Sequence, residues 1–170
     1  MRNMSCAVIA EPAACFPWGY DEEDEGCGAL RLLLLNRISL LTVEGIREFH
    51  VALDDGFGLY AAELVHSLRE AGNRSELICY PAWEEQASKW HPDLRERYFN
   101  ILAACTELVK PAAQTPTCEL DAALNAIDKA GIVLAVCAGE QPRDKTFAAA
   151  LRYAQRTGRS VQCISLPREI

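Results

Sequence analysis

The residues best placed to do chemistry form one short stretch, Asp54-Asp55-Gly56-Phe57-Gly58, between an apolar run and a segment of helical period. A glycine-rich turn that leads from a strand into a helix can bind phosphate, because its backbone amides approach the anion closely and the helix N-terminus is positive. Asp54 and Asp55 place carboxylates at that same helix end, where they would cap the free amides and repel a phosphate. We therefore expect a self-capped turn. The alternative is that these aspartates bind a ribose hydroxyl or a divalent cation.

Four aromatic residues lie in segments that are expected to follow strands: Trp18, Tyr20, Trp83 and Trp90. Their flat faces could stack on a base at the ligand end of an α/β sheet. Aromatic residues in such loops also serve as lids over a hydrophobic core. Both interpretations stand at the level of the sequence.

Glu11, Glu63, Arg143 and Thr146 complete the set of candidate ligand-binding residues. Glu11 follows the first expected strand, and Glu63 lies on the helix after the aspartate turn, where it faces either the pocket or solvent. The side-chain charges of Arg143 and Lys145 could provide a positive potential for a ligand. In glycine-rich turns the backbone amides provide this potential. An exposed loop is the simpler interpretation of that basic pair, and Thr146 opens the last expected helix.

Catalytic patterns are weak. The sequence has no nucleophile elbow and no Ser/His/Asp order, and its three histidines, His50, His66 and His91, stand apart, so we interpret them as structural. If the protein were a hydrolase of nucleosides or nucleotides, Glu11, Asp55 or Glu63 would have to act as the acid or base.

The eight cysteines are spread along the chain, without a CxxC pair or the Cys/His spacing of a zinc site. Several lie inside apolar runs, where a free thiol packs as a small hydrophobe, as is common in a reducing cytoplasm. The sequence therefore indicates no metal and no prosthetic group.

The 170 residues, 50% of them hydrophobic, fit one domain that covers residues 1–170. The formal charge of -7 argues against binding to extended nucleic acid. We expect no signal peptide and no membrane span, since the longest apolar stretch, Leu32–Leu35, is flanked by Arg31, Asn36 and Arg37. A soluble, cytoplasmic protein is expected, and a homo-oligomer is compatible with this composition.

Short apolar or β-branched runs alternate with longer segments of helical period, which is typical of a parallel α/β sheet. The expected strands are residues 6–10, 48–53, 76–81, 107–110, 132–138 and 161–166, and the expected helices are residues 28–44, 58–71, 92–105, 118–130 and 146–157. The pattern predicts an α/β fold: one Rossmann-like domain with a mostly parallel sheet of about six strands and helices on both faces. Ligands of such sheets bind beyond the carboxyl ends of the strands.

Two further features mark the ends of helices. Gly45, Gly72, Gly131 and Gly158 each follow a helical stretch, where a left-handed residue commonly ends a helix. The acidic run from Asp21 to Glu25 precedes the first expected helix, and we interpret it as a solvated loop, with a cation site as the alternative.

Several stretches match one known family in order and over nearly the full length: Phe16-Pro17-Trp18-Gly19-Tyr20, Tyr60-Ala61-Ala62-Glu63, Tyr80-Pro81, Glu85-Gln86, Trp90, Arg97-Tyr98 and Tyr153-Ala154. Together they resemble the YpsA-like branch of the SLOG superfamily, although no single stretch is specific. The resemblance implies a Rossmann-like sheet with a pocket at the strand ends for a nucleotide or a nucleotide-derived molecule.

The loops that would hold this ligand depart from the family pattern. A Thr-Gly-His-Arg-Pro stretch after the first strand is replaced by residues 9–13, so its His and Arg are absent and Glu11 appears. A Ser-Gly-x-x-x-Gly-x-Asp stretch after the second strand becomes residues 51–58, which keep one of its glycines as Gly56. A Gly-Gly-Thr stretch is replaced at residues 141–146, where only Thr146 keeps its type. The Pro-Gly-Gly-x-Gly-Thr-x-x-Glu stretch of related phosphoribohydrolases has no counterpart.

Three functions follow from these observations. The first is a non-catalytic binding or sensor domain for a nucleotide-related molecule. The second is a degenerate family member that acts as a protein-interaction or structural module, and the third is a nucleoside or nucleotide hydrolase. Because Asp54 and Asp55 lie where a phosphate would bind, a ligand is expected to be neutral, cationic or metal-bridged and not a bare phosphate ester.

Overall fold

A single parallel sheet of six strands forms the centre of the molecule in the computed structural model, which describes residues 4–111 and 113–167. The strand order is β4-β3-β2-β1-β5-β6. The strands are β1 (Ser5–Ala10), β2 (Glu48–Ala52), β3 (Glu76–Tyr80), β4 (Glu107–Leu108), β5 (Ile132–Val136) and β6 (Ser160–Ile164). All five strand pairs are parallel. The α/β, Rossmann-like fold predicted from the sequence is confirmed.

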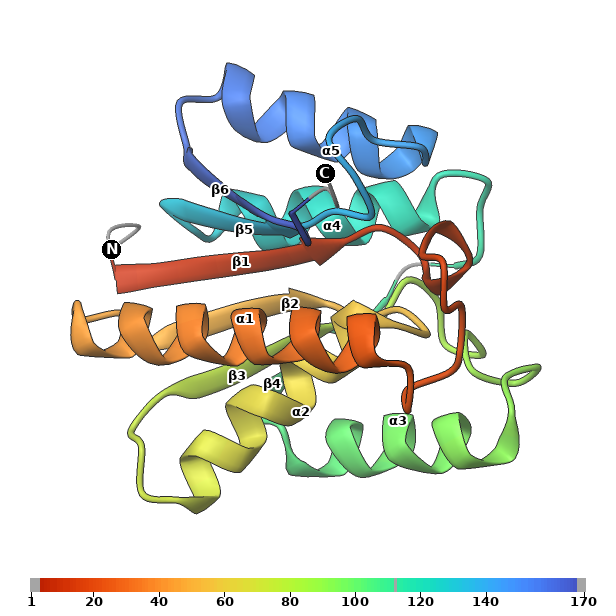
Figure 1. The fold of residues 1–170 in the computed structure, drawn as a ribbon, viewed down its shortest axis with the longest axis horizontal. Helices are drawn as coiled ribbons and strands as arrows, with labels where there is room; N and C mark the ends of the chain where they lie inside the picture. Colours follow the sequence, from red (N-terminus) through yellow and green to blue (C-terminus); the bar gives the residue numbers. More distant parts are fainter. Residues whose placement is uncertain (1–3, 112, 168–170) are drawn as a thin grey trace.

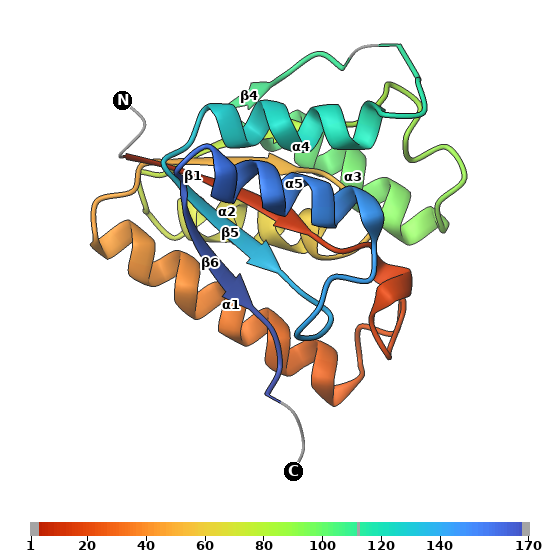
Figure 2. The same cartoon turned by 90° about the horizontal axis from the view of Figure 1, so that it is seen from above.

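Helices cover both faces of this sheet (Figures 1 and 2). One face carries α1 (Glu25–Val43), α2 (Phe57–Glu70) and α3 (Pro92–Ala104). The other carries α4 (Cys118–Asp128) and α5 (Lys145–Arg156). A short 3-10 turn, η2 (Ala13–Cys15), follows β1. Each face therefore has its own hydrophobic core, and the sheet lies between the two, as its continuous apolar strands require.

The direction in which the chain adds strands reverses beside β1. The chain lays down β2, β3 and β4 on one side of β1, and α4 then returns it to the other side, where β5 and β6 follow. Val8 of β1 accordingly pairs with Val51 of β2 on one side and with Leu134 of β5 on the other. In open α/β sheets ligand sites form near such a reversal, at the carboxyl ends of the strands.

Three of the four glycines expected to end helices do so. Gly45, Gly72 and Gly158 have φ of 106, 99 and 80°, the left-handed region that favours glycine. The prediction for Gly131 is wrong, since Gly131 is not among the residues with positive φ. Helix α4 already ends at Asp128, and the amide of Gly131 donates to the carbonyl oxygen of Ser5, 3.2 Å away, at the entry to β5.

The acidic run before α1 is more ordered than a solvated loop. The carboxylate of Asp24 accepts hydrogen bonds from the amides of Gly26 and Cys27, which starts the helix at Glu25, earlier than expected. Glu22 forms ion pairs with Arg31 at 3.3 Å and with Arg97 of α3 at 2.6 Å. These acidic residues therefore cap one helix and connect it to another.

Helix α1 has the length and apolar composition of a membrane span, a property that it shares with core helices of soluble proteins. In this structure, one side of the helix packs on the sheet through Leu30, Leu34, Ile38 and Leu41, all of them buried. The compact α/β fold fits a soluble protein.

Candidate functional site

A cavity of about 270 Å³ lies at the carboxyl ends of β1, β2 and β3, under α4 and α5. We call it the strand-end cleft. Its apolar walls come from the ends of β1 and β2 and from alanines of α4, with Phe147 and Ala150 of α5. Its polar and aromatic lining residues are Asp54, Asp55, Trp83, Gln86, Trp90, Glu119, Asp144 and Thr146.

The turn between β2 and α2 is self-capped, as the sequence predicted. Oδ1 of Asp54 accepts hydrogen bonds from the amides of Gly56 and Gly58, both at 2.8 Å. A Cβ atom on Gly58 would lie 2.5 Å from the carbonyl oxygen of Ala52, and one on Gly56 would lie 3.1 Å from the Cβ of Ala13. Both glycines are therefore needed for the close approach of the helix to β2 and to η2, while the side chain of Asp54 occupies amides that a phosphate would need.

The environment of Asp54 makes its charge costly. Burial raises the pKa of this carboxyl group to about 7, although the hydrogen bonds from Gly56 and Gly58 act in the opposite direction. The neighbouring charge of Asp55 adds to the increase. Asp54 consequently changes its charge near neutral pH.

This shift gives a test of the turn through the pH dependence of stability. Because the folded-state pKa lies above the unfolded value, the folded protein binds the extra proton between about pH 4 and pH 7, so stability falls as the pH rises through that range. In Asp54→Asn the amide oxygen still caps α2 and the titration is gone. At pH 8 we expect the free energy of unfolding of the variant to exceed that of the wild type by roughly 2 kcal/mol. This is about half of the free energy that corresponds to the whole pKa shift, because the cleft admits some solvent.

Urea unfolding of both proteins from about pH 5 to pH 8 measures this difference. A wild type and a variant whose free energies of unfolding run parallel across the range would show that Asp54 does not titrate there. Comparing the two proteins cancels the contribution of buried His50, whose pKa burial lowers.

Three more carboxylates line the cleft. The hydroxyl of Tyr20 donates a hydrogen bond to Oδ2 of Asp55 at 2.5 Å, and this bond is the main reason that the pKa of Tyr20 rises to about 12. Oδ2 of Asp144 accepts from the amide of Phe147 and caps α5. Desolvation, with the charges of Asp144 and Asp55, raises the pKa of Glu119. None of the described residues that line the cleft is Lys or Arg, so its potential is negative.

Aromatic and amide side chains form the rim of the cleft that follows β3. Trp83 and Trp90 both line it, and the ring of Trp90 meets that of Tyr98 edge-on, with 5.0 Å between the ring centroids. Gln86 is buried, and both polar atoms of its side chain form hydrogen bonds: its amide nitrogen donates to the carbonyl oxygen of Leu53, and its oxygen accepts from the amide of Ala82. These bonds fix the loop that carries both tryptophans.

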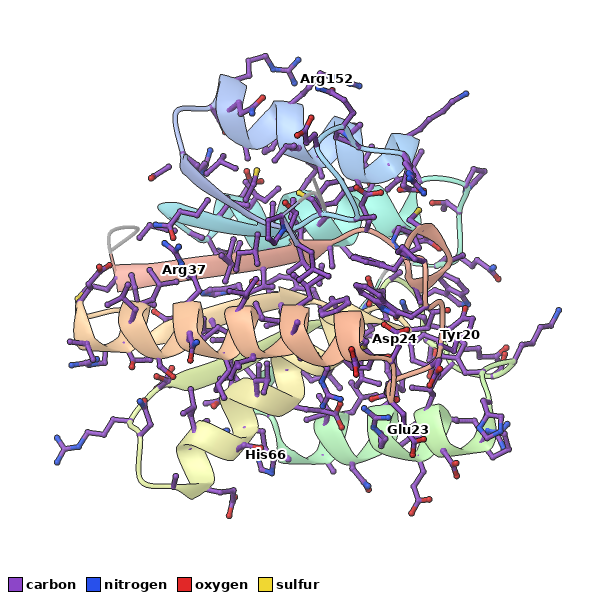
Figure 3. All side chains as sticks on the ribbon, viewed as in Figure 1. Tyr20, Glu23, Asp24, Arg37, His66 and Arg152 are labelled. Carbon is purple, nitrogen blue, oxygen red and sulfur yellow. The ribbon has the colours of Figure 1, made fainter. Side chains whose placement is uncertain are left out.

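Trp18 lies elsewhere. Its ring stacks on Phe16 with 5.3 Å between centroids and meets the edge of Phe57 at 6.2 Å, as part of the core on the α1 face. Tyr20 reaches the cleft only through its hydrogen bond to Asp55 and is itself 55% exposed. Figure 3 shows Tyr20 and Asp24 at the end of the domain toward which the β1 arrow points.

Glu11 fills the position where the strand order reverses. Its carboxylate is completely buried and accepts hydrogen bonds from the amides of Ala138 and Arg143, at 3.4 and 3.2 Å. The guanidinium of Arg143 donates to the carbonyl oxygen of Cys15 at 3.4 Å. Glu11 and Arg143 therefore join the loops after β1 and β5 to each other and do not line the strand-end cleft.

Glu63 points to the opposite face of the sheet. Its carboxylate forms two hydrogen bonds with the guanidinium of Arg97, at 2.7 and 3.0 Å, and Arg97 also binds Glu22. The guanidinium of Arg97 also lies 5.6 Å from the centroid of the ring of Tyr60, a residue of α2. This cluster ties the acidic run to α2 and α3.

The structure thus brings together only part of the predicted set. Asp54, Asp55, Trp90 and Thr146 line the cleft, with Gly56 and Gly58 directly behind Asp54. Glu11, Trp18, Glu63 and Arg143 do not line it, and Tyr20 is attached to its edge. Trp83, an aromatic residue expected at the ligand end, lines the cleft as well, whereas the sequence reasoning missed Gln86, Glu119 and Asp144 as lining residues. Of the missed residues, Glu119 was the easiest to predict from the sequence, because it lies in the first turn of α4, the helix that returns across the sheet.

The described lining of the strand-end cleft contains no histidine and no cysteine. Within residues 4–111 and 113–167, no group of three or more His, Cys, Asp or Glu side chains is placed to hold a metal ion. His50 is hydrogen-bonded to the hydroxyl of Tyr80 at 2.7 Å and does not line the cleft. No protein-family model and no curated protein matches the chain.

Proposed function

We propose that this domain binds a small, planar, nucleoside-like molecule, neutral or cationic, in the strand-end cleft and does not catalyse a reaction on it. The observation that carries the proposal is the lining of the cleft: tryptophans on one rim, apolar walls, and four carboxylates. Indole faces favour a flat ring by stacking, and the carboxylates favour hydroxyl and amino donors or a positive charge.

The same lining disfavours a phosphate ester. The amides of Gly56 and Gly58 at the N-terminus of α2 are already bonded to Asp54. Asp55 and Glu119 add negative charge where a phosphate would approach, and no described lining residue offsets it. A nucleotide would have to point its phosphate out of the cleft.

Binding without catalysis is supported by the placement of the candidate acids and bases. Glu11 is bonded to two backbone amides, and Glu63 to Arg97, so neither is available to a molecule in the cleft. Asp54 titrates near neutral pH, but its Oδ1 atom is committed to capping α2.

A thermal-shift screen tests this proposal, because a ligand that binds only the folded protein raises its melting temperature. Adenosine, other nucleosides and nicotinamide riboside should stabilise the protein more than AMP, NAD and ADP-ribose, with or without magnesium. Trp90→Leu should abolish the stabilisation, while Trp18→Leu, a tryptophan outside the cleft, should retain it. Stabilisation by the phosphorylated compounds alone would contradict the proposal.

As a second candidate function, the domain is a cytoplasmic module for protein interaction or for structure. A degenerate member of the YpsA-like branch is expected to act in this way. Polar groups of the altered loops bind one another here: Glu11 bonds to the loop after β5, Tyr20 to Asp55, and Asp54 to its own helix. This candidate predicts that no compound of the screen stabilises the protein.

A further inference from the structure

Helix α1 is apolar on both of its sides. The inner side lies in the core, and on the outer side Leu32, Leu33, Leu40 and Val43 are 58, 40, 48 and 83% exposed. A helix on the surface of a soluble domain ordinarily carries polar residues there. Figure 2 shows α1 at the outer edge of the domain, with no other element on its far side. The outward residues, which we call the α1 stripe, are Ala29, Leu32, Leu33, Asn36, Leu40 and Val43.

The α1 stripe has the spacing of a helix-packing seam. Ala29, Asn36 and Val43 recur at seven-residue intervals, and so do Leu33 and Leu40. A seven-residue repeat keeps one line of side chains facing a partner helix, and a single polar residue in such a line commonly fixes the register. Asn36 is that residue, at the centre of the stripe.

The stripe is also nearly symmetric about Asn36. If a second α1 lies antiparallel with its Asn36 opposite the first, Ala29 faces Val43 and Leu32 faces Leu40. Small residues then meet large ones, and the two asparagine side chains, which both donate and accept, meet on the axis. This self-complementarity is what a two-fold interface between identical chains requires.

The ends of the stripe carry opposite charges. Glu25 begins the helix, and the guanidinium of Arg47 lies at its other end, where it donates to the carbonyl oxygens of Thr42 and Ile46. An antiparallel pair places each Glu25 near Arg47 of the other chain and opposes the two helix dipoles. A parallel pair would place like charges and like dipoles together.

We propose that two copies of this chain associate through their α1 stripes, antiparallel, about a two-fold axis at Asn36. The four large apolar side chains expose on the order of 400 Å², within the range of functional surface patches. That area is about half of what each partner buries in a standard interface, so the dimer dissociates on dilution. A membrane is disfavoured as the occupant, since the net charge is -7 and the stripe lacks a flanking row of basic residues.

Sedimentation equilibrium of the full chain over a wide concentration series tests the dimer. We expect a monomer–dimer equilibrium for the wild type and a monomer throughout for Leu40→Glu. Leu108→Glu is the matched control, because Leu108 is 45% exposed on β4, away from α1, and it should dimerise as the wild type does. A wild type that stays monomeric, or an equal loss in both variants, overturns the proposal.

A charge exchange tests the two-fold geometry. Glu25→Lys and Arg47→Glu should each raise the dissociation constant roughly tenfold, since each change acts twice across the axis, and the double variant should recover wild-type affinity. Circular dichroism verifies that every variant is folded. If the double variant does not recover the wild-type dissociation constant, the antiparallel arrangement is overturned. A monomer that cosediments with phosphatidylcholine–phosphatidylserine vesicles overturns the proposal, because the α1 stripe then binds a membrane.

Discussion

Replacing Gly58 by alanine should destabilise the protein by about 3 kcal/mol, which lowers the melting temperature by roughly 10 °C for a chain of this length. The added Cβ would lie 2.5 Å from the carbonyl oxygen of Ala52 and 2.8 Å from Oδ1 of Asp54. The first of these atoms belongs to the backbone of β2, so no side-chain rotation relieves the contact. Helix α2 would have to move away from the sheet, which weakens the cap from Asp54.

Gly28 offers a matched control within the same fold. It is also a helical glycine, and a Cβ added there meets no heavy atom within 4 Å. Gly28→Ala should therefore stabilise the protein by up to about 1 kcal/mol through helix propensity. Calorimetric melting of the two variants should give shifts of opposite sign. Shifts of the same sign would mean that α2 does not approach β2 as closely as described.

Replacing Glu11 by alanine should cost about 2 kcal/mol, because the partly buried amides of Ala138 and Arg143 lose the buried carboxylate that accepts their hydrogen bonds. This carboxylate, together with the bond from Arg143 to Cys15, joins the loop after β5 to the segment after β1. Glu11→Gln, which retains one acceptor oxygen and nearly the same volume, should lose less.

Hydrogen exchange locates this effect. In Glu11→Ala the amides of Ala138 and Arg143 should exchange faster, while those of β2 and β3 should keep their protection relative to global stability. Unchanged protection at both amides would rule out the role assigned to Glu11.

Local features of the chain were predictable because their partners are close in sequence. The alternation of apolar runs with helical periods placed all six strands and five helices, and Asp54 caps amides only two and four residues ahead. The shortest strand, β4, ends at Leu108 instead of residue 110. The misplaced end at Gly131 arose because a strand entry and a helix end can both use a glycine.

The sequence could not reveal the roles of residues whose hydrogen-bond partners lie far away along the chain. Glu11 bonds to Arg143 across 132 residues, and Glu63 to Arg97 across 34. Position along the chain placed Glu11 after the first strand and Glu63 on the helix after the second strand. The hydrogen bonds that engage these glutamates depend on how α3 and the loop after β5 pack. Glu119 and Asp144 reach the cleft for the same reason, since α4 and α5 close over it from the far half of the chain.

The central claim is that the strand-end cleft accepts a nucleoside-like molecule and rejects a phosphate. Isothermal titration of the wild type with adenosine and with AMP tests it most directly, because the two differ only in the phosphate. We predict that adenosine binds at least about tenfold more tightly, and that Asp55→Asn narrows this gap by removing one charge from the lining. Tighter binding of AMP, or no binding of adenosine at millimolar concentration, would contradict the account.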